Sequence, residues 1–156
     1  MTIRKAEIID VKGILDLLSQ VLELHAKIRP DIFIPGTAKY TENEVMEIIN
    51  DKNRRTYVAV DADSRVIGYA LCEIKSFTSS NFIVPHKEMY IDDLCVDSSA
   101  RGRHIGRQLF EYVKEEARRL GCYEITLNVW EGNSGAADFY KKMNMEPKST
   151  TMELIL

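Results

Sequence analysis

The chain has 156 residues, of which 45% are hydrophobic and 29% charged, as expected for one globular domain spanning residues 1–156. Its formal net charge of −3 disfavours a nucleic-acid partner, because bulk binding to nucleic acid favours basic domains. No apolar run approaches the roughly 18 residues of a membrane span. Residues 1–9 mix charged with apolar groups, unlike a signal peptide. We therefore expect neither a membrane partner nor a secretory leader.

The three cysteines, Cys72, Cys95 and Cys122, are widely spaced and lie in apolar stretches. An odd number without a CxxC pair argues against a disulfide framework or a zinc ribbon. We expect buried free thiols and a cytoplasmic protein. No pair of histidines has metal-ligand spacing, so no metal is expected.

The first half of the chain begins with a predicted strand over residues 2–9. Apolar residues at helical spacing then predict a helix from Asp10, its expected N-cap, to about His25. Two prolines and a glycine within residues 29–36 predict irregular chain.

A second helix is predicted at "TENE", where Thr41 and Glu44 have the spacing of a capping box. Residues 56–60 and 65–74, joined by a polar turn, predict a β-hairpin, and residues 75–87 predict a loop.

The second half of the chain alternates strands with helices. We expect a central strand over 88–96, a helix over 108–121, a strand over 123–129, a helix over 134–144 and a last strand over 150–156. The expected fold is a single α/β (α+β) domain, with a mixed, mostly antiparallel, twisted sheet flanked by about four helices.

A glycine- and arginine-containing segment, "RGRHIGR", lies between the central strand and the next helix. The first amides of a helix lack intrahelical acceptors, and the helix dipole adds partial positive charge there. The glycines let the backbone turn its N–H groups inward and let a ligand approach, and the arginines suit phosphate oxygens. The segment therefore predicts a phosphate or diphosphate site formed by Arg101, Gly102, Arg103, His104, Ile105, Gly106 and Arg107.

Other interpretations of this segment were weighed. It lacks the spacing and the lysine of a P-loop, and the dinucleotide fingerprint G-x-G-x-x-G is absent. An RGR triplet can enter a DNA minor groove, but no wider basic stripe accompanies it. A solvated basic loop that merely precedes a helix is the structural alternative.

A second motif, N-x-x-A-x-x-F-Y, runs from Asn133 to Tyr140. Together with V-x-x-x-x-R-G-x-x-I-G-x-x-L, from Val96 to Leu109, it resembles the GNAT superfamily of acyl-CoA-dependent N-acyltransferases. The resemblance spans the chain. The family loop usually has the form [RQ]-x-x-G-x-[GA], and His104 stands at its middle glycine, so His104 must adopt a positive φ or the turn must differ.

The resemblance implies transfer of an acetyl group from acetyl-CoA to a primary amine of a small molecule or peptide, by direct attack in a ternary complex. It places the main-chain groups that hold pantetheine and polarise the thioester at Leu94, Cys95 and Val96. It assigns Tyr140 as the acid that protonates the leaving thiolate, and it puts Asn133 near the cofactor arm.

The acceptor amine must also lose a proton, since a lysine-like ammonium has a pKa of about 10.4. Glu88, Asp92 and Asp93 are candidate bases. In a regular strand Asp92 shares a face with Tyr90, Leu94 and Val96 while Asp93 points the other way, which favours Asp92.

The acceptor is expected between the first helix and the loop at 75–87. Phe33, Tyr90 and Asp92 are its predicted contacts, with Phe77 and Phe82 completing an apolar wall. Small amines, amino acids, aminoglycosides and peptide N-termini all stay open as acceptors. A non-catalytic acyl-CoA or anion sensor with the same fold is the alternative function. The apolar end "LIL" can pair with a sheet edge of a second chain, so a homodimer also stays open.

Overall fold

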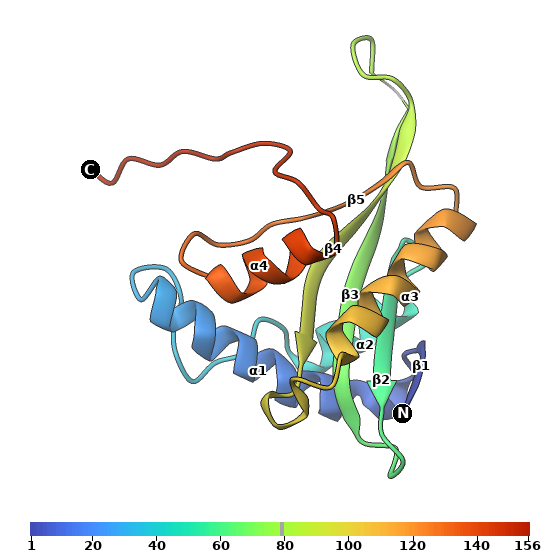
Figure 1. Ribbon diagram of the computed structural model, residues 1–156, viewed down its shortest axis with the longest axis vertical. Helices are drawn as coiled ribbons and strands as arrows, with labels where there is room; N and C mark the ends of the chain where they lie inside the picture. The colour runs from blue at the N-terminus through green and yellow to red at the C-terminus, as the bar shows by residue number, and fades with distance from the viewer. Residues whose placement is uncertain (79) are drawn as a thin grey trace.

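The computed structural model describes residues 1–78 and 80–156, and a five-stranded sheet with the order β1-β2-β3-β4-β5 forms its centre (Figure 1). The first four strands pair antiparallel, whereas β4 and β5 run parallel. The predicted mixed, mostly antiparallel sheet is therefore confirmed. The strands are β1 (Thr2–Lys5), β2 (Arg54–Val60), β3 (Val66–Phe77), β4 (His86–Val96) and β5 (Glu124–Leu127).

Four helices flank the sheet, as expected. Successive strand residues point to opposite faces of the sheet, and both faces carry apolar side chains that need covering. Val58, Tyr69 and Leu71 form one core with the first two helices, whereas Ala70 and Cys72 form a second core with the third helix. Both cores are fully buried at their centres. The helices are α1 (Val11–Ile28), α2 (Glu42–Asn50), α3 (Ile105–Arg119) and α4 (Ser134–Lys142).

Local capping signals were predicted with mixed success. The capping box is confirmed, since Thr41 Oγ1 accepts from the amide of Glu44 and Glu44 Oε2 accepts from the amide of Thr41 at 2.7 Å. Asp10 is the N-cap residue of α1, as predicted, but its side chain makes no capping bond to that helix. It also ends a 3₁₀ turn, η1 (Ile8–Asp10), and its carboxylate binds Arg4 at 2.7 Å. The first strand ends at Lys5, four residues earlier than predicted.

Several boundaries differ from prediction because tertiary pairing extends the elements. Strand β3 continues to Phe77 and β4 begins at His86, so the two ends of the predicted loop are strand. Ser79 lies outside the described residues. The helix α3 begins at Ile105, three residues before the expected start. Within the described chain, no helix combines the length and apolarity that crossing a bilayer requires.

The predicted last strand is wrong, because residues 150–156 are irregular and extend away from the sheet (Figure 1). Glu153 forms an ion pair with Arg29 at 2.7 Å. The apolar side chains of this tail are exposed: Met152, Leu154, Ile155 and Leu156. A strand needs a hydrogen-bonding neighbour, and this segment lies beside none in the described chain.

The thiols are free, as predicted. Cys72 and Cys95 are buried, whereas Cys122 is only half-buried, contrary to the expectation that all three would be in the core. Asn144 adopts a left-handed φ of 63° after α4, a conformation that asparagine tolerates better than most residues.

Candidate active site

The separation of β4 from β5 organises the candidate site. The two strands pair from Glu88 opposite Glu124 to Ile91 opposite Leu127, where β5 ends. β4 continues to Val96 while the chain after β5 turns away toward α4 (Figure 1). The main-chain groups of β4 beyond Ile91 therefore lose their parallel partner, and the predicted residues Leu94, Cys95 and Val96 all lie in this stretch.

A β-bulge lies at the point of separation. Leu71 of β3 is opposite Asp93 and the next residue, Cys72, is opposite Ile91, so Asp92 has no cross-strand partner. This breaks the alternation assumed from the sequence. Asp92 therefore does not share a regular strand face with Leu94 and Val96, and that expectation was wrong.

The segment 101–107 places the start of α3 beside the free end of β4. Gly102 and His104 have left-handed φ values of 77° and 58°, and His104 is the N-cap of α3 without a side-chain capping bond. The first helical bond runs from the amide of Gln108 to the carbonyl of His104. The amides of Ile105, Gly106 and Arg107 therefore have no intrahelical acceptor and can bind an anion.

Other residues of the predicted loop shape this start of the helix. Gly106 has an ordinary helical backbone. A Cβ there would lie in ordinary van der Waals contact, 3.4 Å from Phe139 and 3.5 Å from Val96, so packing alone does not require a glycine. Arg101 donates from Nε to the carbonyl of Val96 at 3.3 Å, while the side chains of Arg101, Arg103 and Arg107 are exposed to solvent.

Tyr140 lies on α4, which Asn133 begins by accepting a hydrogen bond from the amide of Ala136 at 3.2 Å. The Tyr140 ring packs against Phe110 and Phe139, with centroids 6.1 and 5.0 Å away. Burial raises the pKa of the Tyr140 phenol far above its ordinary value, and the Asp93 carboxylate adds to this shift. The phenol is therefore protonated at neutral pH and able to donate.

The two acidic residues at the bulge differ in environment. Asp92 accepts from Lys39 Nζ at 2.9 Å and from the Tyr40 hydroxyl at 2.7 Å, so both carboxylate oxygens have partners. Asp93 accepts from the Tyr69 hydroxyl at 2.9 Å, and burial raises the pKa of Asp93 to about 6. Lys39 opposes this shift but does not cancel it.

The profile of the acetyltransferase (GNAT) family matches residues 18–145. The chain belongs to this family. It is an N-acetyltransferase, and acetyl-CoA is the donor that the family uses. The resemblance inferred from the two sequence motifs is thus confirmed.

Individual relatives agree with the family assignment. The chain is 27% identical over 154 residues to glucosamine 6-phosphate N-acetyltransferase from Arabidopsis thaliana, covering 96% of this chain and 93% of that protein. A crystal structure of a variant of the BH1408 protein from Bacillus halodurans superimposes with a TM-score of 0.96 at 30% identity, covering 100% of this chain and 99% of that one. The crystal structure of the Arabidopsis enzyme gives a TM-score of 0.72 at 25% identity, covering 99% of this chain and 97% of that one.

The predicted acceptor contacts of this acetyltransferase are not gathered into one wall. Phe33 lies edge-on to Trp130, with centroids 5.2 Å apart. Tyr90 accepts from Asn128 at 3.1 Å and has Lys75 Nζ 3.6 Å above its ring. Phe82 is 90% exposed and Phe77 stacks on His86, so neither belongs to an apolar acceptor wall.

Three residues near the bulge escaped the sequence analysis: Lys39, Tyr40 and Tyr69. Lys39 and Tyr40 follow the irregular segment after α1, and Tyr69 lies on β3. No local motif marks them, because only the folded chain brings them to the acidic pair.

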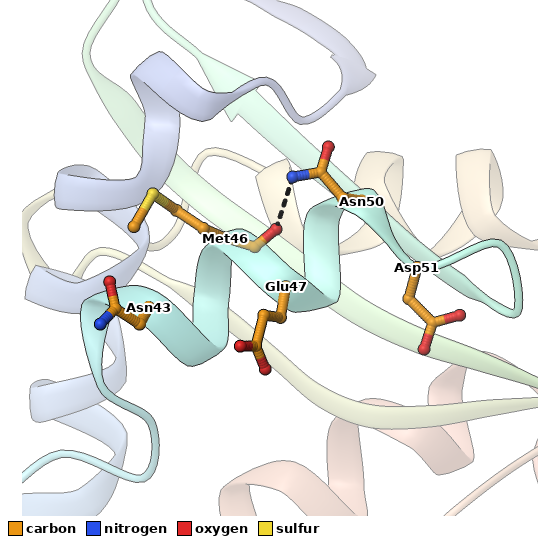
Figure 2. Close-up of a pocket in the computed structure, with 5 residues that line it drawn as sticks. All are labelled: Asn43, Met46, Glu47, Asn50 and Asp51. Carbon is orange, nitrogen blue, oxygen red and sulfur yellow. Dashed lines mark hydrogen bonds between the residues drawn. The ribbon is translucent and has the colours of Figure 1, made fainter.

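A hollow on α2 is unrelated to this site. Figure 2 shows its lining side chains, which come from one helix and its end, with Asn50 donating to the carbonyl of Met46 at 3.0 Å. None of the predicted site residues of the acetyltransferase lines it. The lining residues are Asn43, Met46, Glu47, Asn50 and Asp51.

Proposed function

We propose that this N-acetyltransferase moves an acetyl group from acetyl-CoA to a primary amine by direct attack in a ternary complex. The observation that supports this most is the joint position of the β4–β5 separation and the open start of α3. The first exposes main-chain groups suited to pantetheine, and the second offers the amides of Ile105, Gly106 and Arg107 to a diphosphate.

The edge of β4 that β5 has left, over residues 94–96, would polarise the thioester carbonyl. Leu94, Cys95 and Val96 still pair with β3 on the other edge, so only those main-chain N–H groups that point away from β3 are open. A preorganised donor of this kind contributes about 2.7–4 kcal/mol to lowering a barrier. This assignment depends on backbone geometry, so side-chain changes at these positions test it poorly.

The Tyr140 phenol would protonate the leaving thiolate. The phenol is protonated at neutral pH, as an ordinary phenol is, but burial raises its pKa further above the thiol value of about 8.5 and so makes it a weaker acid. The acid role therefore rests on the match of Tyr140 to the family motif and not on its pKa. We expect Tyr140→Phe to lower kcat roughly 10²–10⁴-fold with the dissociation constant of acetyl-CoA nearly unchanged. Stopped-flow turnover and equilibrium titration measure the two quantities, and an unchanged kcat would remove Tyr140 as the acid.

Asp93 is the proposed proton acceptor, in place of Asp92. An ion pair with Lys39 and a hydrogen bond from Tyr40 already occupy Asp92, whereas Asp93 is half-buried and desolvation raises its pKa to about 6. A carboxylate of this pKa is ionised above pH 6 and becomes protonated below it. It therefore accepts a proton at neutral pH more readily than an ordinary aspartate would.

The two aspartates form a matched pair for mutation. We expect Asp93→Asn to lower kcat/KM roughly 10²-fold or more and to abolish the fall in activity below about pH 6. Asp92→Asn, one residue away and equally isosteric, is expected to cost less and to retain that pH limb. Circular dichroism controls for folding, and a larger loss in Asp92→Asn would return the base role to Asp92.

The acceptor class is tested by thiol release across an amine panel. The panel should contain glucosamine 6-phosphate, which the Arabidopsis relative acetylates by name, with an aminoglycoside, lysine and a short peptide bearing a free N-terminus. We expect stabilisation of the chain by acetyl-CoA and turnover on at least one primary amine. Stabilisation without turnover on a broad panel would favour the sensor.

The sensor alternative depended on His104 distorting the loop. His104 instead takes the left-handed φ that the family glycine position requires, so the turn into α3 is kept.

We also propose a homodimer in which the tail at 150–156 of one copy pairs with β5 of the other. β5 pairs only with β4 among the described strands, so its other edge is open, and no residue of β5 or α4 is fully buried. The tail offers an unpaired apolar segment, including Leu154 at 83% exposed. In a dimer, the tail of each chain can therefore pair with the open β5 edge of the other.

Light scattering tests the dimer directly. We expect the full chain to have twice the monomer mass, and Leu154→Asp or removal of residues 150–156 to yield monomers. Thr150→Asp adds the same charge outside the apolar run and is expected to stay dimeric. A monomeric full chain at micromolar concentration would rule the pairing out.

A further inference from the structure

A histidine and two glutamates meet at the paired base of β4 and β5. His86 and Glu88 are two residues apart on β4, and Glu124 is opposite Glu88 on β5. One ligand atom from each lies within 4.8 Å of the others. Neither the family assignment nor the proposed acetyl transfer uses these three side chains.

The His86 ring is oriented with one nitrogen free to ligate. Its Nδ1 lies 2.8 Å from the carbonyl of Val84, which can only accept, so Nδ1 carries a hydrogen. Phe77 stacks on the ring at 4.8 Å and Tyr123 meets it edge-on. In the neutral ring the lone pair therefore lies on Nε2, and a carbonyl holding the other nitrogen is the usual arrangement behind a metal-bound histidine.

That free nitrogen faces a carboxylate. His86 Nε2 lies 3.6 Å from Glu124 Oε1, and in the neutral ring both atoms are acceptors. Two facing acceptors need a proton or a cation between them. An imidazolium or a bound metal ion would strengthen this contact, although the Lys148 ammonium already pairs with the same carboxylate oxygen.

Glu88 adds a buried anion to this contact. Its residue is 7% exposed, and Thr126 Oγ1 donates to Oε1. Lys75 lies 4.0 Å from the same oxygen, with its ammonium over the Tyr90 ring. Because these contacts involve Oε1, Oε2 is left to ligate, and a buried carboxylate is stabilised by a cation close to it.

Lys148 is the cation beside the third ligand. It pairs with Glu124 Oε1 at 2.5 Å and its side chain is 61% exposed. An exposed lysine of this kind contributes little free energy to an ion pair and moves away readily. It therefore competes with a metal ion for Glu124 without blocking the site.

We propose that His86, Glu88 and Glu124 bind one divalent transition-metal ion of the zinc type. One imidazole nitrogen and two carboxylate oxygens are ligands that zinc accepts, with water in the fourth position. Tetrahedral ligand atoms about 2.1 Å from zinc lie about 3.4 Å apart. The three ligand atoms now lie within 4.8 Å of one another, and small side-chain rotations bring them to the zinc-bound spacing.

Such an ion would tie β4 to β5 just below the point where they separate. The sequence predicted no metal, because it offered no pair of histidines at ligand spacing. The cluster instead depends on the pairing of Glu88 with Glu124, which only the sheet creates.

The test is titration of the chelator-treated full chain with Zn²⁺ alone, followed by calorimetry, and with Co²⁺ followed by visible absorption. The Cys122→Ser background removes the half-buried thiol as a competing ligand. We expect one ion per chain and the visible bands of four-coordinate Co²⁺. His86→Ala and Glu124→Gln are expected to weaken binding at least tenfold, and His25→Ala is expected to leave it unchanged.

Lysine variants separate this site from an adventitious surface contact. Lys148→Ala removes the competing cation and is expected to tighten zinc binding, whereas Lys142→Ala, on α4, is expected to have no effect. Failure of Zn²⁺ and Co²⁺ to bind the parent chain would overturn the proposal. Zinc binding that is unchanged in both His86→Ala and Glu124→Gln would also overturn it. Circular dichroism confirms that each variant is folded.

Discussion

A strand that leaves its neighbour exposes main-chain donors and acceptors that must find another partner, and in this chain that strand is β4. The parallel pairing with β5 stops after Ile91, and the bulge at Asp92 lies at the same point. Beyond it, β4 pairs only with β3, and Leu94 lies in the same apolar cluster as Phe139 and Tyr140 of α4. The candidate site lies where this pairing is lost, and the bulge there positions the side chains of Asp92 and Asp93.

Burial then sets the protonation of the reacting groups. It raises the pKa of both Tyr140 and Asp93, but with opposite chemical consequences. The carboxylate, with a pKa of about 6, is still mostly ionised at neutral pH and is a stronger base than an ordinary aspartate. The phenol is protonated at neutral pH even without burial, and its raised pKa makes it a weaker acid. Burial therefore favours the base role of Asp93, whereas the acid role of Tyr140 rests on its place in the family motif.

The elements with local signals were predictable. The capping box at Thr41, the amphipathic stripe of α3 and the two motifs that identify the family depend on residues close in sequence. At His104 the sequence left a positive φ and an altered turn open, and the structure shows the left-handed φ.

Features set by long-range pairing were not predictable. The bulge at Asp92 depends on the register with β3, so the assumed strand alternation selected the wrong face. Lys39 reaches Asp92 across 53 residues, and no spacing in the sequence indicates that contact. The tail at 150–156 has a strand-like pattern but no neighbouring strand in the described chain.

A crystal structure of the chain with coenzyme A tests the central claim most directly, since it locates the diphosphate relative to the start of α3. The account predicts diphosphate oxygens about 3 Å from the main-chain nitrogens of Ile105, Gly106 and Arg107, with the pantetheine arm between β4 and β5. Coenzyme A bound with its diphosphate away from these nitrogens, or with its arm outside the β4–β5 separation, would contradict it.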